Sequence, residues 1–168
     1  MPPHKKLAGQ RRTNKSMKQL PLSVTGKTKY DLRTQFSALP FRVVAGKLEI
    51  LLITSRGTGR WIIPKGWPMA DTTPSDAAAT EAFEEAGVEG KIYKTCIGLY
   101  SYTKQMDDMP NLPCVAMVYA LKVKKIFKDY PEVDQRKRKW FSQSKAAKKV
   151  DEPELRAIIS SFDRSLLS

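Results

Sequence analysis

The chain has 168 residues, 41% of them hydrophobic and 28% charged, which fits one globular domain with flanking segments and is too short for two ordinary domains. Its 2 cysteines make no disulfide framework, so a reducing, cytoplasmic location is predicted, and its longest apolar run, residues 114–121, is far below the roughly 20 residues that cross a bilayer. The only histidine, His4, lies in a basic segment, which excludes Ser-His-Asp and Cys-His nucleophiles and histidine-rich zinc sites. Any hydrolytic chemistry must therefore use carboxylates.

Positive charge is the second general feature of the chain. Its 30 lysines and arginines outnumber its 17 acidic residues, and the resulting net charge of +13 favours an anionic partner such as phosphates, nucleic acid or acidic lipid. The basic residues concentrate in the first 35 positions and again in residues 122–139. Each cluster would also serve simply as a solvated surface. The charge therefore indicates an anionic partner without selecting one.

The N-terminal third combines an irregular segment with a predicted hairpin. Residues 1–34 mix proline, glycine and basic residues without periodicity, so we predict a mostly flexible basic tail ahead of a domain at residues 35–168. Two β-rich runs, 36–45 and 48–54, are separated by Gly46-Lys47, a spacing typical of a hairpin. A third short strand is predicted at residues 61–63.

A central helix and a second group of strands follow. Thr73 and Pro74 are typical of a helix start, and Gly87 of a helix end. Strands are predicted at residues 91–102, 113–123 and 139–141, and two C-terminal helices at residues 142–149 and 153–167. This order predicts an α/β fold, with a mixed sheet covered by helices on both faces.

Three carboxylates share one face of the predicted central helix. Glu81, Glu84 and Glu85 are spaced i, i+3 and i+4, and no lysine or arginine between Gly66 and Gly90 neutralises them. Hard oxygen ligands this close suit Mg²⁺, or alternatively Mn²⁺, which bind a few carboxylates together with waters and substrate phosphates. A solvated acidic face without function explains three glutamates alone equally well, so the flanking sequence has to decide.

Residues 66–88, GWPMADTTPSDAAATEAFEEAGV, resemble the Nudix box, G-x5-E-x7-R-E-U-x-E-E-x-G-U, in which U is a bulky aliphatic residue. The matching positions are Gly66, Glu81, Glu84, Glu85, Gly87 and Val88. Thr72 stands where the first glutamate belongs, and Thr80 where the arginine belongs. The resemblance covers residues 36–155 and is greatest to the branch of diphosphoinositol polyphosphate and diadenosine polyphosphate phosphohydrolases. It implies an α/β/α sandwich of the Nudix type.

The resemblance also implies roles for the residues of the box. Glu81 and Glu85 would ligate the metal, Glu84 would be a third ligand or orient the set, and the backbone carbonyl of Gly66 or Lys65 would join them. Glu84 and Glu85 would then be the catalytic residues. The general base stays open among Glu84 and three loop acids, which are Glu132, Asp107 and Asp108.

Four cations are candidates for binding substrate phosphates. Lys65 directly precedes the box glycine, and Arg56 and Arg60 flank the short loop before Trp61. Arg42 alternates with apolar residues on a predicted strand and is expected to face the same cleft. Each of them would otherwise be an ordinary surface cation.

The sequence predicts a metal-dependent hydrolase that cleaves a phosphoanhydride bond in a small polyphosphate-rich substrate, either a diphosphoinositol polyphosphate or a dinucleoside polyphosphate. RNA is a less favoured partner within the same chemistry. The alternative is a degenerate Nudix domain that binds phosphate or RNA without turnover, because Thr72 and Thr80 replace two residues of the box. The oligomeric state and the role of the basic tail do not follow from the sequence.

Overall fold

The computed structural model describes residues 17–22, 32–108 and 111–167, so most of the tail predicted over residues 1–34, including His4, lies outside the described residues. Eight strands in the described part form one sheet, in which β3, β2, β1, β7 and β5 are neighbours in that order, with β4 on β1, β6 on β7 and β8 on β2. β1 and β7 are parallel and the other pairs are antiparallel, which confirms the mixed sheet. The strands are β1 (Arg33–Val44), β2 (Lys47–Thr54), β3 (Trp61–Ile62), β4 (Lys65–Gly66), β5 (Val88–Ile92), β6 (Gly98–Lys104), β7 (Leu112–Ile126) and β8 (Arg138–Ser142).

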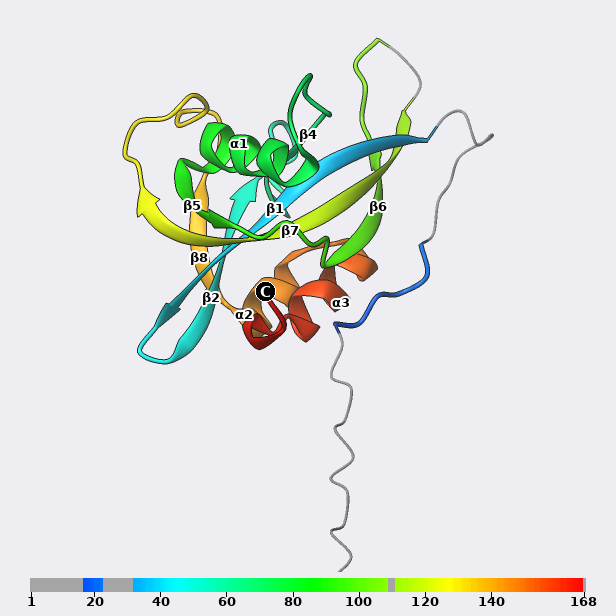
Figure 1. The fold of residues 1–168 in the computed structure, drawn as a ribbon. Helices are drawn as coiled ribbons and strands as arrows, with labels where there is room; N and C mark the ends of the chain where they lie inside the picture. Colours follow the sequence, from blue (N-terminus) through cyan, green and yellow to red (C-terminus); the bar gives the residue numbers. More distant parts are fainter. Residues whose placement is uncertain (1–16, 23–31, 109–110, 168) are drawn as a thin grey trace, which may run out of the picture.

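Helices cover both faces of this sheet. Figure 1 shows α1 (Pro74–Ala86) on one side, and α2 (Gln143–Lys149) and α3 (Pro153–Ser161) on the other. β1 serves both layers because its side chains alternate: Ala38 belongs to the core under α1, whereas Leu39 and Phe41 belong to the core under α2 and α3. The predicted α/β/α sandwich is confirmed. None of the described helices has the length and apolar character needed to span a membrane.

α1 begins and ends as predicted, because local contacts define both of its ends. The Thr73 side chain accepts a hydrogen bond from the backbone N–H of Asp76, and Pro74 opens the helix. Gly87 adopts a left-handed conformation with φ of +64° and donates its N–H to the carbonyls of Ala82 and Phe83. Residues 66–88, which resemble the Nudix box, therefore run from the end of β4 through a loop into one complete, capped helix.

Two predicted elements have different bounds in the structure. The hairpin turn is Ala45-Gly46 rather than Gly46-Lys47, since Val44 pairs with Lys47, and the positive φ angles of 50° and 74° suit the twist of the two strands. The strand predicted at residues 91–102 is interrupted between β5 and β6. Both pieces still pair with β7, β5 with its second half and β6 with its first half, so they lie one after the other along the same neighbouring strand.

The last predicted helix, residues 153–167, is also shorter than expected. α3 ends at Ser161, where the side-chain amide of Gln143 donates to the carbonyls of Ile159 (2.9 Å) and Phe162 (2.8 Å). A separate 3₁₀ turn, Arg164–Leu166, follows. A side chain from α2 thus ends α3, which the sequence of α3 alone does not reveal.

A short piece of the predicted tail contacts the domain. The backbone N–H of Lys18 donates to the Ser161 hydroxyl (2.9 Å), and Gln19 exchanges two hydrogen bonds with the backbone of Leu99 (2.6 and 2.8 Å). Residues 17–22 therefore connect α3 with the start of β6.

Candidate active site

Two of the three glutamates of α1 lie against the short strand β4. Glu85 is only 7% exposed, and its Oε2 accepts a hydrogen bond from the backbone N–H of Lys65 at 3.4 Å. Glu81 packs on Gly66 so closely that a Cβ at that position would lie 2.0 Å from its Oε1. Glycine is therefore required at position 66 for the Glu81 carboxylate to occupy this place. The predicted box glycine and the predicted ligands meet in the structure.

The pKa values of both carboxylates are raised above the usual value for glutamate. Burial, followed by the repulsion of neighbouring glutamates, raises the pKa of Glu81 from 4.5 to about 7. Burial also raises the pKa of Glu85, although Arg136 and Lys65 favour its charged form. Because opposite charge would stabilise both ionised forms, the pair is well suited to a cation.

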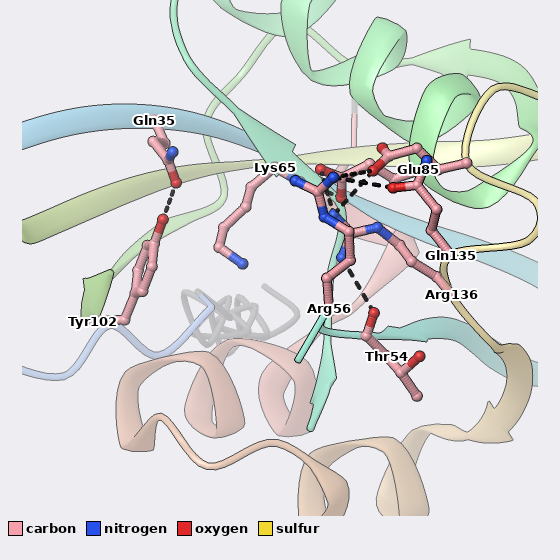
Figure 2. Close-up of polar contacts among 9 residues, drawn as sticks. Gln35, Thr54, Arg56, Lys65, Glu85, Tyr102, Gln135 and Arg136 are labelled. Carbon is pink, nitrogen blue, oxygen red and sulfur yellow. Dashed lines mark hydrogen bonds and ion pairs between the residues drawn. The ribbon is translucent and has the colours of Figure 1, made fainter. Parts of the chain in front are cut away.

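The ammonium group of Lys65 lies near enough to Glu85 for each charge to shift the pKa of the other group. Burial lowers its pKa from 10.5 to about 8, against the opposing effect of Glu85 and Glu152. Its Nζ lies 4.8 Å from the centroid of the Tyr102 ring, and the Tyr102 hydroxyl contacts the Gln35 side chain. Figure 2 shows the Lys65 side chain between this pair and a group of arginines and glutamates. Within the described part of the chain its ammonium forms no ion pair, so it is free to bind an anion.

A buried arginine that was not among the predicted site residues holds Glu85. Nη2 of Arg136 lies 3.4 Å from Oε1 of Glu85 and 3.4 Å from Oε1 of Glu132, and its Nη1 donates to the carbonyl of Thr54 at 3.2 Å (Figure 2). Arg56, which was predicted, lies 3.5 Å from the same oxygen of Glu132. The sequence showed Arg136 only as part of a basic run, with nothing to separate it from its neighbours.

Arg60 and Arg42 occupy different surroundings. Nη1 of Arg60 lies 3.4 Å from both Asp151 and Glu152, at the start of α3. Glu152 is 8% exposed and lies near Lys65, and it was not among the predicted site residues. Arg42 instead pairs with Glu49 at 2.9 Å and lies 4.0 Å from the centroid of the Trp140 ring.

The position of Arg42 along β1 removes it from the carboxylates. Phe36 pairs with Gly66, and Arg42 is six positions further along the strand. At about 3.3 Å per residue this is roughly 20 Å. The structure therefore places Lys65 beside Glu85, Arg56 beside Glu132 and Arg60 beside Glu152. It does not bring Arg42 there, because the strand carries that residue toward the hairpin end of the sheet.

The four candidate bases differ in what surrounds them. The side chain of Glu84 has no hydrogen bond or ion pair among the described residues, while its carbonyl accepts the backbone N–H of Glu132 at 3.0 Å. Glu132 is held by two arginines. Asp107 and Asp108 lie in the loop after β6, outside the helix that carries the proposed ligands. Of the four, Glu84 is the one that lies on α1 itself.

The site's donor set fits a hard divalent cation. Among the described residues, no group of three acidic, imidazole or thiol side chains already converges as a complete metal cage. Mg²⁺ does not require one, since it binds through one or two carboxylates and fills its other positions with waters and phosphate oxygens. The half-buried Glu81 and the buried Glu85, both with a raised pKa, supply such a pair, and Glu84 lies on the same helix.

Comparison with known proteins adds a family to this geometry. Residues 33–162 match the family described as NUDIX domain. The chain is 34% identical over 138 residues to Nudix hydrolase 16, mitochondrial, of Arabidopsis thaliana (74% of this chain, 76% of that protein). It is 37% identical over 103 residues to diphosphoinositol polyphosphate phosphohydrolase 3-beta of Bos taurus (60% and 58%). The chain thus spans little more than half of that bovine relative.

One solved structure shows the same fold. The crystal structure of C. elegans Ap4A hydrolase has a TM-score of 0.58 and 20% identity, covering 80% of this chain and 98% of that one. At this identity the likeness concerns the arrangement of strands and helices. It agrees with a sheet placed between α1 on one side and α2 and α3 on the other.

Proposed function

Since the chain belongs to the Nudix hydrolase family, which acts on phosphoanhydride bonds, we propose that it hydrolyses a small polyphosphate-rich substrate with the help of Mg²⁺ or Mn²⁺. The observation that carries the proposal is a pair of carboxylates, the half-buried Glu81 and the buried Glu85, placed against β4 at Gly66 and Lys65. The two substrate classes proposed are diphosphoinositol polyphosphates and dinucleoside polyphosphates. Both present the adjacent phosphates that such a site would bind.

Glu81, Glu85 and Glu84 would hold the metal, with the backbone carbonyl of Gly66 as a further ligand. Such an ion lowers the pKa of a bound water and neutralises phosphate oxygens. Glu85 is fixed by Arg136 and the backbone of Lys65, so its carboxylate has a defined direction. The unpaired carboxylate of Glu84 would accept the proton of the attacking water, as the catalytic base.

Three cations would bind the phosphates of the substrate. Lys65 has no ion pair among the described residues. Arg56 pairs with Glu132, and Arg60 pairs with the two acids at the start of α3. Arg56 and Arg60 are 62% and 40% exposed, so their carboxylate partners are weakly held and phosphates would compete for them. Arg42, which pairs with Glu49 at the hairpin end of β1, lies outside this set.

A panel of polyphosphates tests the proposal. Phosphate release is measured from diphosphoinositol, dinucleoside and nucleoside polyphosphates with and without Mg²⁺, for the wild type, Glu85→Gln and Glu89→Gln. Glu89 is an exposed acid on β5 and serves as the matched control. Mg²⁺-dependent release that is lost in Glu85→Gln and kept in Glu89→Gln is expected, and the preferred panel member names the substrate class. Tight phosphate or RNA binding without any release would instead indicate a binding module.

The predicted location is part of the same proposal. Cys96 and Cys114 are free thiols, which suits a reducing compartment such as the cytoplasm. Fractionation of cells that produce the full chain tests this location directly, and recovery in a membrane-bound organelle would contradict it.

A further inference from the structure

The helix that carries the glutamates has no cation of its own. The Nudix box has an arginine at the position that Thr80 occupies in this chain. Threonine carries no charge, so it cannot replace the positive charge of that arginine. The Thr80 hydroxyl donates to the carbonyl of Asp76 at 3.0 Å, a contact within α1. Thr72, at the other departure, donates to a carbonyl of its own loop. Something outside the helix must therefore hold the carboxylates in place.

Arg136 is in position to do this. Its side chain is only 7% exposed, and it lies in the segment between β7 and β8, far from α1 in the sequence. One nitrogen lies 3.4 Å from both Glu85 and Glu132, and another donates to the carbonyl of Thr54 at the end of β2 (Figure 2). Because the guanidinium is planar and held from three segments, it fixes the direction of the carboxylate that it contacts.

We propose that Arg136 is a positioning residue that replaces the missing arginine of the box and orients the Glu85 carboxylate for metal binding. The inference rests on the proposed function, because it takes Glu85 as a metal ligand. It adds the reason why a chain with threonine at position 80 would keep an ordered metal site. A positive charge that reaches a ligand from outside the coordination sphere commonly determines metal affinity in this way.

Arg138 offers a matched control two positions away. It donates to the carbonyls of Ala86 (2.8 Å) and Phe127 (2.6 Å), and its guanidinium lies 4.7 Å from the centroid of the Tyr130 ring. Arg138 thus holds the C-terminal end of α1, but among the described residues it pairs with no carboxylate. Arg136 lies just before β8 and Arg138 is its first residue, and both contact α1, but only Arg136 contacts a proposed ligand.

The test measures Mn²⁺ affinity by titration calorimetry without substrate, together with urea unfolding, for the wild type, Arg136→Met, Arg136→Lys and Arg138→Met. We expect Arg136→Met to lose about 10-fold or more in Mn²⁺ affinity, in the range typical of groups that orient a ligand. Arg136→Lys should lose less, since it keeps the charge without the planar contact. Arg138→Met should unfold at lower urea but bind Mn²⁺ like the wild type.

Two results would overturn the inference. One is Mn²⁺ affinity in Arg136→Met or Arg136→Lys that equals or exceeds that of the wild type. An arginine that only neutralised Glu85 would repel the metal ion, so its replacement would not weaken binding. The other is an equal loss in Arg138→Met, which would trace the effect to the position of α1. If Arg136→Met does not fold, the comparison of Arg136→Lys with Arg138→Met decides. Absence of Glu85-dependent Mn²⁺ binding in the wild type would instead contradict the proposed function itself.

Discussion

Replacing Glu81 by glutamine should change how the stability of the metal-free protein depends on pH. The pKa of Glu81 is raised from 4.5 to about 7 in the folded protein, first by burial and then by neighbouring carboxylates. Between these two values the folded chain keeps a proton that the unfolded chain releases. The stability due to this proton is therefore complete below about 4.5 and is lost as the pH rises through about 7.

The size of the effect follows from the same two values. At about 1.4 kcal/mol per pH unit, the difference between 4.5 and about 7 sets an upper limit of roughly 3.5 kcal/mol. Because the side chain is only half-buried, solvent screening reduces the expected loss to about 1–2 kcal/mol. Glu81→Gln has no proton to release at this position, so its stability should fall by that much less between pH 4.5 and pH 8.

Urea unfolding in EDTA at several pH values measures this difference, read as the free energy of unfolding of the wild type minus that of the variant. Glu89→Gln, which removes an exposed acid, should keep the pH dependence of the wild type. Identical pH profiles for the wild type and Glu81→Gln would refute the reasoning, because they would mean that burial against Gly66 does not perturb this carboxylate.

Two further outcomes are expected. Gly66→Ala places a Cβ 2.0 Å from Oε1 of Glu81, and the end of this flexible side chain can move away, so the variant should fold nearly as stably as the wild type. The displaced carboxylate should lower Mg²⁺-dependent phosphate release about 10-fold or more. Unchanged release would show that the position of Glu81 is unimportant. Lys65, with a pKa of about 8, should bind phosphates less well above that pH, so KM of the wild type should rise there, whereas Lys65→Met should have a high KM throughout; parallel profiles would exclude Lys65 from substrate binding.

The helix of the box could be predicted closely because its signals are local. Thr73, Pro74 and Gly87 act on backbone groups within a few residues of themselves, and the structure places α1 between them. The spacing of Glu81, Glu84 and Glu85 likewise determines that they share one side of that helix.

The bounds of other elements depended on distant partners. α3 ends where Gln143 of α2 reaches its last carbonyls, so the apolar pattern of residues 153–167 overestimated its length. The strand predicted at residues 91–102 is interrupted between β5 and β6, which both pair with β7, and no residue in between is a typical strand breaker. Register and termination were therefore set by neighbours in space.

The family, the capped helix and the residues at its side, Glu81, Glu85, Gly66 and Lys65, could be predicted from motif and spacing, because these depend on residues close together in the chain. Which cations join them depends on the fold. It placed Arg136 on Glu85 and carried Arg42 along β1 toward Glu49. The physical reason is that an ion pair depends on distance in space, and the fold alone brings the segment before β8 against α1.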